Sequence, residues 1–596
     1  MSTEQAPRSP WWESLWLLVG LSIAITIAVM LSIDPSGHYP ASFEGPGITT
    51  DEIFNVQQGV LQVKLLQAYN IALINPLSWC DLYSNEMYLP DHPPLGRYWL
   101  GMFHELAQTA LPPQTEQPFV IAAARFGSAV GFGLVVFLTG GITRRWASPL
   151  AGLIAALATA FIPRLWGHAH IASLEIPVML TYLGVVGYLG TVWAKEQGKP
   201  SLKPLLIGSL LLGVALLTKI QGVLLTVPVG LWLLLWWRVK GVQTALLWGL
   251  CGGLAFFIGW PWLWLDPVNH TMEYLGRSTD RISLPVWYFG QQYADTETPW
   301  HYPWVMTLVT MPLTHWLLMG GLAFRQQISA EKPADEQADE DQSLLAKRLS
   351  LTAIVALFPL LLFSTHVAIY DGIRLFSMSF PLLAILVGVG AERWIACFRP
   401  HQQRIAMLTI LAVLFTNVGF LWRTHPVSLS SYNVLAGSLA SSPETGFELN
   451  YWNDSWTRSF MQKALAEIEP GSLVLVEPVL HQFQLIEITR QYPGWSNAIA
   501  LQSPEQRTQH ADPNQTLLVA GQQGKTLQSS RPQYLMIFSR RANLNQGFYE
   551  QANWQTGELP LWGQPVVSYS REGVVLAALY KLNSETMDLR NDQPMD

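Results

Sequence analysis

The sequence predicts an α-helical, polytopic membrane protein with a small α/β domain after its last transmembrane helix. Half of the 596 residues are hydrophobic (50%) and only 13% are charged, whereas soluble proteins carry about 25% charged residues. The 26 tryptophans also fit a membrane protein, because this side chain favours the membrane–water interface. The net charge of −7 argues against a nucleic-acid partner, which requires a basic face.

Apolar segments of bilayer length predict about eleven transmembrane helices. The first begins at residue 14 and is about 20 residues long. This length is sufficient to span a bilayer, so the segment is not expected to be a cleavable signal peptide. The three cysteines lie far apart, which argues against a disulfide framework or a cysteine-based metal site. The predicted spans are 14–33, 119–141, 148–164, 171–194, 204–219, 221–237, 243–265, 303–324, 349–369, 373–394 and 403–422.

Lysine and arginine in the short connections give the orientation, because cytoplasmic connections carry the excess of these residues. The cation-rich side holds Arg144, Arg145, Lys195, Lys199, Lys203, Arg238, Lys240, Lys347, Arg348, Arg393, Arg399 and Arg404. The opposite side holds only Arg164, Lys219, Arg277, Arg281 and Arg374. We therefore expect a protein of the cell (inner) membrane, with a transmembrane domain over 1–422. The first loop, about 34–118, and a domain over 423–596 are expected on the extracytoplasmic face.

Two segments outside the spans have a distinct character. Glu331–Gln342 is acidic and lacks apolar periodicity, so we expect a flexible cytoplasmic linker over about 326–347. The tail contains apolar runs of strand length, separated by stretches with helical character, and this pattern predicts a small α/β domain. The expected strands are Ser472–Glu477, Gln533–Ser539 and Val574–Tyr580, and the expected helices lie near 465–468 and 483–492.

The acidic pair Asp51-Glu52 in the first outer loop is the first candidate for chemistry. Apolar residues recur behind it at spacings of three and four, which predicts an amphipathic helix on the membrane surface. Thr49 and Glu52 fit a capping box, so the pair can be explained by helix capping alone. The two interpretations are compatible, since a carboxylate fixed at a helix start is preorganised to act as a general base.

Four further groups of polar residues flank the spans on the same predicted face. Asp91-His92-Pro93-Pro94-Leu95-Gly96-Arg97 is a rigid turn that either only leads into an interfacial helix or presents His92 and Arg97 to a phosphate. The outer loop after the third span offers Arg164, His168, His170 and Glu175. Lys219 is either a snorkelling lysine or a contact for an anionic headgroup. Asp371 and Arg374 form either a local ion pair or part of a phosphate site.

Metal binding receives little support from these residues. His168 and His170 are two positions apart and lack further ligands, so no metal centre is expected. A divalent ion at Asp51, Glu52 and Glu175 is left open. Taken together, the carboxylates and cations suit a phosphorylated leaving group that departs opposite a general base.

The order of these motifs resembles the membrane-embedded GT-C glycosyltransferases. The closest groups are the protein O-mannosyltransferases (glycosyltransferase family 39) and the aminoarabinose transferases that act on lipid A. The resemblance covers about residues 10–400, and its most specific parts are Asp51-Glu52 and His92–Gly96. Glu175 stands where many members have Asp, and Arg97 replaces the commoner Lys.

The resemblance implies an inverting transfer of a sugar from a polyprenyl-phosphate donor on the outer face. By this likeness Asp51 matches the catalytic acid, Glu52 and Glu175 are supporting acids, and the cations are expected to contact the phosphate. These expected substrate-binding residues are His92, Arg97, Arg164, His168, Lys219 and Arg374. The expected partners are the lipid-linked donor, membrane lipids and a lipid, glycan or protein acceptor. The sequence lacks the MIR-type repeats of eukaryotic mannosyltransferases, which weakens the case for a protein acceptor.

Two other classes of function are compatible with the chain. A transporter or flippase of lipid-linked saccharides would need polar residues at mid-bilayer and broken helices in related halves. The acids lie at the ends of spans instead, which favours the enzyme. A binding or assembly protein would not require Asp51.

Overall fold

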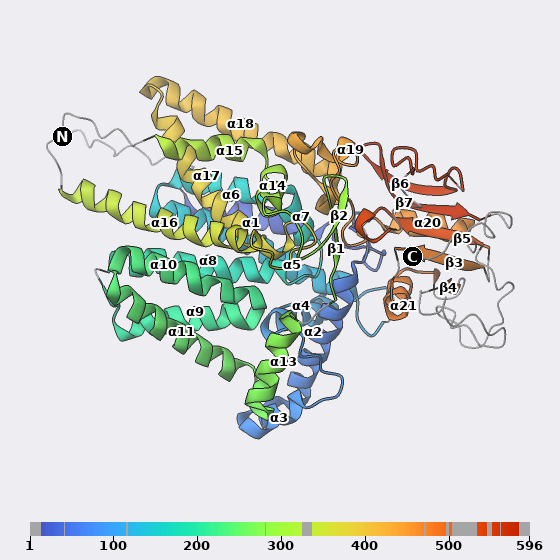
Figure 1. Ribbon diagram of the computed structural model, residues 1–596, viewed down its shortest axis with the longest axis horizontal. Helices are drawn as coiled ribbons and strands as arrows, with labels where there is room; N and C mark the ends of the chain where they lie inside the picture. Colours follow the sequence, from blue (N-terminus) through green and yellow to red (C-terminus); the bar gives the residue numbers. More distant parts are fainter. Residues whose placement is uncertain are drawn as a thin grey trace, which may run out of the picture.

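The computed structural model describes residues 14–582, apart from 41, 115–116, 197, 280–281, 325–335, 470–471, 479, 496–499, 503–532, 545–550 and 561. It consists of a long helical bundle with a small sheet domain at one end (Figure 1). The fold class predicted from the sequence is thereby confirmed.

Among the described residues, seven helical segments are long and apolar enough to cross a membrane, and two bent helix pairs raise the number to nine. Two shorter apolar helices overlap two further predicted spans. The seven contain α5 (Ile121–Trp146), α8 (Glu175–Thr191), α10 (Thr226–Trp237), α11 (Val239–Gly259), α16 (Glu336–Phe363), α17 (Ser379–Ala396) and α18 (Pro400–Thr424). The bent pairs are α6 (Pro149–Ala160) with α7 (Pro163–Ala169) and α14 (Tyr302–Thr310) with α15 (Leu313–Met319). The shorter helices are α1 (Leu15–Met30) and α9 (Leu202–Thr218).

The bend between α6 and α7 matters most for the site. The two helix axes differ by 69°, and Pro163 begins α7, where its missing N–H costs no hydrogen bond. The bend turns α7 towards the C-terminal tail, against which it packs through η7 (Ser428–Ser430). Arg164 and His168, both on α7, therefore lie at a junction of the membrane part and the tail.

The first loop contains three helices: α2 (Thr50–Tyr69), α3 (Pro76–Tyr83) and α4 (Pro94–Ala110). The expectation that α2 lies on the membrane surface is wrong for its first half. Ile53, Val56 and Val60 are buried inside the protein rather than turned to lipid. The reason is a close helix crossing, because Gly59 and Gly101 bring α2 and α4 so near that a Cβ on Gly101 would lie 2.1 Å from the Gly59 carbonyl oxygen.

The expectation of a flexible linker over about 326–347 is wrong for residues 336–347. Helix α16 begins at Glu336, so residues 336–347 of the expected linker are helical. Residues 326–335 lie outside the described residues. The segment is rich in alanine, glutamate, glutamine, leucine and lysine, which favour helices. Acidic side chains in the first turns also interact favourably with the positive end of the helix dipole.

The C-terminal domain is built on one five-stranded sheet with the order β4-β3-β5-β7-β6. β3 pairs in parallel with β4 and β5, and β7 pairs antiparallel with β5 and β6. The three predicted strands correspond to β3, β5 and β7, whereas β4 and β6 were not predicted. The strands are β3 (Leu473–Glu477), β4 (Ala500–Gln502), β5 (Tyr534–Phe538), β6 (Val567–Arg571) and β7 (Val574–Lys581), and the helices α20 (Arg458–Glu467) and α21 (Gln482–Gln491).

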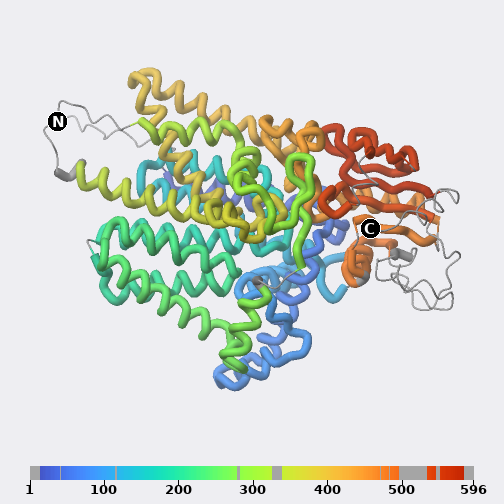
Figure 2. Tube along the Cα trace, in the orientation of Figure 1, coloured from blue at the N-terminus to red at the C-terminus, as the bar shows by residue number. Residues whose placement is uncertain are grey.

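The first loop and the sheet domain share one hydrophobic core. Ile53 and Val56 of α2 belong to the same buried cluster as Trp456 and Val474. The ring of Phe54 on α2 also lies 4.9 Å from that of Phe483 on α21, centroid to centroid. Figure 2 shows the blue first-loop segment running beside the orange C-terminal segment. The tail is therefore part of the body that carries the first-loop residues.

The remaining elements connect these parts. They are η2 (Asn70–Ile74), η3 (Trp193–Lys195), η4 (Ile220–Leu225), α12 (Trp262–Leu265), α13 (Pro267–Thr279), β1 (Pro285–Tyr288), β2 (Gln291–Ala294), η5 (Gly320–Ala323), η6 (Arg374–Phe376), η8 (Val434–Ala436), α19 (Ser438–Ser441) and η10 (Arg541–Asn543). The hairpin β1–β2 was not predicted from the sequence.

Candidate active site

Arg374, the first residue of η6, lies at the centre of a network of ion pairs. Its Nη2 donates to an oxygen of Asp51, and its Nε lies 3.2 Å from Oε1 of Glu175. Its Nη1 lies 3.0 Å from Oδ2 of Asp371. One guanidinium group thus joins three carboxylates from three distant parts of the chain.

Lys219 adds a second cation to this network. Its Nζ lies 2.6 Å from Oε1 of Glu175, the same oxygen that faces Arg374. Helix α9 ends at Thr218, and Lys219 has an extended backbone before η4 begins. The break between two helices therefore places the ammonium group at the end of a span rather than within it.

The three acids differ in their exposure. The side chains of Glu175 and Asp371 are 2% and 5% exposed, whereas that of Asp51 is 35% exposed. Asp51 lies in the first turn of α2, where the N-terminal end of the helix favours a negative charge. Asp51 is therefore the carboxylate of this network that an incoming molecule can reach.

Two residues of the C-terminal tail complete the surroundings of Asp371. The indole N–H of Trp452 donates to Oδ2 at 2.7 Å, and Nη2 of Arg540 donates to Oδ1 at 2.8 Å. The guanidinium carbon of Arg374 also lies 4.4 Å from the centroid of the Trp452 ring. Sequence reasoning missed Trp452 and Arg540, because only the tertiary packing of the tail brings them to the membrane part.

Glu52 does not join this network. Both of its oxygens bind Arg125 of α5, each at 2.7 Å from a guanidinium nitrogen, and both side chains are fully buried. The backbone N–H of Thr49 donates to Glu52 at 2.9 Å, which confirms the predicted capping box. The N–H of Ala172 donates at 2.6 Å. Glu52 thus ties the first loop to α5 and to the segment after α7.

The turn before α4 also forms a closed unit. Arg97 is buried and makes a bidentate pair with Asp91, at 2.6 and 2.8 Å. It donates further to the Leu89 carbonyl at 3.1 Å and to the Asn55 side chain at 3.3 Å. Burial, together with the nearby cation of Arg97, lowers the pKa of His92 to about 3, so this imidazole is neutral at pH 7.

Arg164 and His168 lie in a neighbouring pocket. The guanidinium carbon of Arg164 lies 4.3 Å from the centroid of the Tyr432 ring and 4.8 Å from that of Tyr451, and its Nε donates to the Ser431 carbonyl at 3.0 Å. The His168 ring meets the Trp452 ring edge-on, with 5.5 Å between centroids.

No group of three or more His, Cys, Asp or Glu side chains in the described part of the chain is arranged to hold a metal ion. Of the three acids left open for a divalent ion, Glu52 is bound to Arg125, while Asp51 and Glu175 both contact Arg374. His170 faces Ser32, with 3.0 Å between its Nε2 and the hydroxyl oxygen.

A protein-family comparison supports the class that this geometry suggests. Residues 81–269 match the family model described as dolichyl-phosphate-mannose-protein mannosyltransferase. The matched segment contains Arg97, Arg164, Glu175 and Lys219, and it ends before Arg374. A search of curated proteins gives no match. The resemblance to the protein O-mannosyltransferases predicted from the motifs is thereby confirmed for this segment.

The chain also aligns with solved structures, with TM-scores below 0.5. ArnT from Cupriavidus metallidurans in the apo state is 13% identical with a TM-score of 0.45, and the alignment covers 94% of this chain and 97% of that one. AglB from Archaeoglobus fulgidus is 10% identical with a TM-score of 0.43, covering 98% and 76%. The S. cerevisiae Pmt1-Pmt2 complex is 17% identical with a TM-score of 0.29, covering 48% and 39%.

Proposed function

We propose that this protein is a membrane glycosyltransferase that moves a sugar from a polyprenyl-phosphate-linked donor to an acceptor on the outer face of the cell (inner) membrane. The observation that carries the proposal is the position of Asp51. It is the accessible acid in a network that also holds Lys219 and Arg374. A base beside cations is the arrangement that transfer from a phosphate leaving group requires.

In this proposal Asp51 is the general base. The acceptor oxygen or nitrogen attacks the anomeric carbon, the bond from that carbon to the phosphate oxygen breaks, and Asp51 takes the acceptor proton. Attack opposite the leaving group inverts the anomeric centre. Arg374 orients Asp51 before reaction, because its guanidinium is fixed by Glu175 and Asp371 as well.

The cations supply the stabilisation of the departing phosphate. Lys219 and Arg374 are both held by carboxylates, so a phosphate oxygen would take the place of one of these partners. Glu175 acts by holding both cations at one oxygen, which makes it a positioning residue rather than a base.

The expected topology fits the same proposal. Glu175 begins α8, Lys219 follows α9 and Arg374 precedes α17, so the network joins the ends of helices. A flippase of lipid-linked saccharides remains the alternative, and it would require such polar groups along a path through the bilayer. The excess of lysine and arginine on the opposite loops supports an extracytoplasmic position for the site and for the C-terminal domain.

The test is turnover of a polyprenyl-phosphate sugar by the purified protein, measured as release of free polyprenyl phosphate. Wild type should release polyprenyl phosphate. Asp51→Asn should lower the rate of release about 10²–10⁴-fold, which is the range for removing a general base. The exposed variant Arg277→Gln is the matched control, since its partner Glu273 is also exposed. Turnover by folded Asp51→Asn at the wild-type rate would refute the role of Asp51, and transport without release would favour the flippase.

A further inference from the structure

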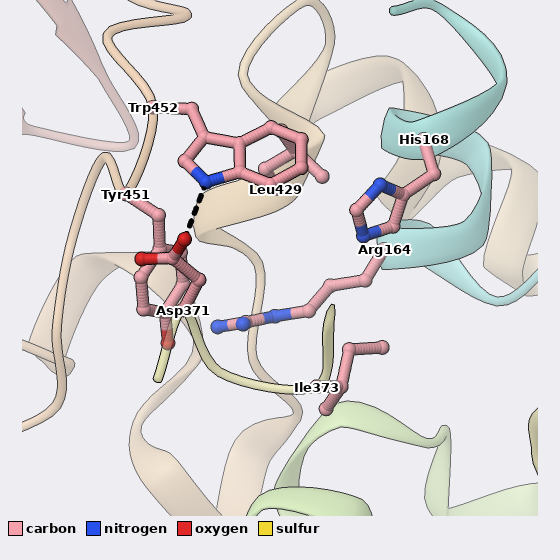
Figure 3. A pocket seen from close by; sticks show the side chains of 7 residues that line it. All are labelled: Arg164, His168, Asp371, Ile373, Leu429, Tyr451 and Trp452. Atoms are coloured by element: carbon pink, nitrogen blue, oxygen red, sulfur yellow. Dashed lines mark hydrogen bonds between the residues drawn. The ribbon is translucent and has the colours of Figure 1, made fainter. Parts of the chain in front are cut away.

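The tail side of the ion-pair network is filled by side chains of this chain. Figure 3 shows Arg164 extending from α7 towards Asp371 and Tyr451. Trp452 closes the same region from the tail and donates its indole N–H to Asp371. The pocket that remains between these side chains has room for little more than one water molecule. A sugar that reacts beside Asp51 is therefore expected on the other side of the network, towards the first loop.

Asn55 lies in the first loop, one helical turn after Asp51 on the same face of α2. Residues four apart on a helix have their Cβ atoms about 5–6 Å apart, a separation comparable to the width of one sugar ring. Asn55 is 5% exposed, so a small part of its side chain still faces solvent. A sugar whose anomeric carbon lies near Asp51 can therefore also contact Asn55.

The beginning of α4 joins Asn55 to the network. Nε of Arg97 donates to Oδ1 of Asn55 at 3.3 Å. The preceding residue, Gly96, packs so closely on the end of α9 that a Cβ there would lie 2.9 Å from the carbonyl oxygen of Thr218. Lys219 follows Thr218 directly. Asn55 and Lys219 therefore flank the same turn of α4.

The amide of Asn55 is oriented by Arg97. A guanidinium group only donates, so the atom that faces its Nε is the amide oxygen and not the amide nitrogen. Arg97 is itself fixed by the bidentate pair with Asp91, at 2.6 and 2.8 Å. Nδ2 of Asn55 makes no hydrogen bond within the described residues. The structure therefore holds an oriented N–H donor beside Asp51 that no described part of the chain uses.

The charge around Asn55 suits a hydroxyl group rather than a phosphate. Asp91 neutralises the guanidinium of Arg97, and the lowered pKa of His92, about 3, leaves this imidazole neutral at pH 7. The amide of Asn55 is uncharged as well. A phosphate is drawn instead to Lys219 and the other cation of the network, which stabilise it in the proposed reaction.

We propose that Asn55 is a sugar-binding residue, whose Nδ2 donates to a hydroxyl of the sugar on the polyprenyl-phosphate donor. The inference deepens the proposed function and rests on the donor which that function assigns. Asn55 would also select among sugars, because a sugar without a hydroxyl at that position leaves the amide unpaired and binds less tightly. A hydroxyl of the acceptor is the other source of the same chemistry, and the experiment separates the two.

The test is binding to the full-length protein in nanodiscs. One probe is polyprenyl phosphate without sugar. The other is the donor that wild type binds most tightly, chosen from a panel of polyprenyl-phosphate pentoses and hexoses. The ratio of the two affinities isolates the contribution of the sugar, because both probes share the lipid and the phosphate.

Asn55→Asp keeps an oxygen for Arg97 and removes the N–H donor. It should lower the affinity ratio about 3–10-fold, the loss expected for one hydrogen bond between neutral groups. Asn55→Ala removes both polar atoms without adding a charge, and it should lower the ratio in the same way. Gln57→Glu is the matched control, because it makes the same change from amide to acid at an exposed position of α2. Its ratio should equal that of wild type.

A merely structural role of Asn55 predicts a different pattern. If the side chain only braces Arg97, then Asn55→Asp retains this contact, and its affinity ratio would match that of wild type. The sugar contact predicts a lower ratio in a protein whose unfolding temperature equals or exceeds that of wild type. An unchanged ratio in both Asn55 variants would overturn the contact to the donor sugar.

The outcomes also separate this inference from the proposed function. An unchanged ratio with slower release of polyprenyl phosphate would place the contact on the acceptor and overturn the contact to the donor sugar. A lower ratio in the Asn55 variants would support the sugar contact even if wild type released no polyprenyl phosphate. That absence of release would refute the glycosyltransferase alone.

Discussion

The indole N–H of Trp452 donates to the Asp371 carboxylate across 2.7 Å, and the same carboxylate binds Arg374 at 3.0 Å. Through Asp371, Trp452 of the tail thereby helps to position Arg374, the cation that contacts Asp51. This relationship makes the geometry of the site dependent on the C-terminal domain.

Trp452→Phe should lower transfer activity about 10-fold or more, because it removes a hydrogen bond to a charged group. The phenyl ring still covers Arg374 and His168, so the protein should stay folded. Release of polyprenyl phosphate and the unfolding temperature are the measurements. Wild-type activity in the folded variant would show that the indole N–H does not position Asp371.

Arg540→Gln should also reduce activity, because Asp371 loses the guanidinium bound at Oδ1 and then draws more strongly on Arg374. Arg540→Lys should restore part of the loss by restoring the charge. Lys581→Gln is a suitable control on the same domain, since Lys581 and its partner Glu469 are both exposed. Equal activities of the glutamine and lysine variants would exclude this electrostatic role.

Glu52→Gln should destabilise the protein by about 3–5 kcal/mol, because it leaves Arg125 as an uncompensated buried charge. The expected readout is a lower unfolding temperature, with activity lost in proportion to the folded fraction. Asp51→Asn provides the comparison, since Asp51 is partly exposed and its replacement should lower turnover without unfolding the protein. An Glu52→Gln protein as stable as wild type would show that the pair with Arg125 contributes little to folding.

Glu448 should make stability depend on pH. Burial raises its pKa from an ordinary value of 4.5 to about 7, although Arg540 and Arg541 oppose the shift. The folded state therefore holds a proton that the unfolded state releases, so the contribution to stability falls as pH rises from about 4.5 to about 7.

Glu448→Gln mimics the protonated side chain and should lose this dependence. Relative to the variant, wild type should lose about 1–3 kcal/mol of stability between pH 5 and pH 8. Unfolding temperatures of both proteins across this range are the measurement. Parallel curves for the two proteins would contradict the raised pKa.

The sequence predicted the apolar helices and the polar residues at their ends, because long apolar runs and the charged residues that interrupt them are local patterns. It could not predict that the side chains of Asp51 and Glu52 would bind different partners. Adjacent helical residues point about 100° apart, so one carboxylate faces Arg374 and the other faces Arg125. Trp452 and Arg540 carry no local signal, since their contacts with Asp371 exist only once the tail has packed.

The core that the first loop shares with the sheet domain has a consequence for biogenesis. Glu44 accepts the backbone N–H of Ser459, a residue 415 positions later. Ile53 and Val56 of α2 are covered by Trp456, which is likewise synthesised much later. During synthesis, the loop must keep an apolar face exposed until about three-quarters of the chain has been made, and contacts of such separation form slowly. A truncated chain that ends after its last span would therefore retain the apolar helices and leave this face of the first loop uncovered.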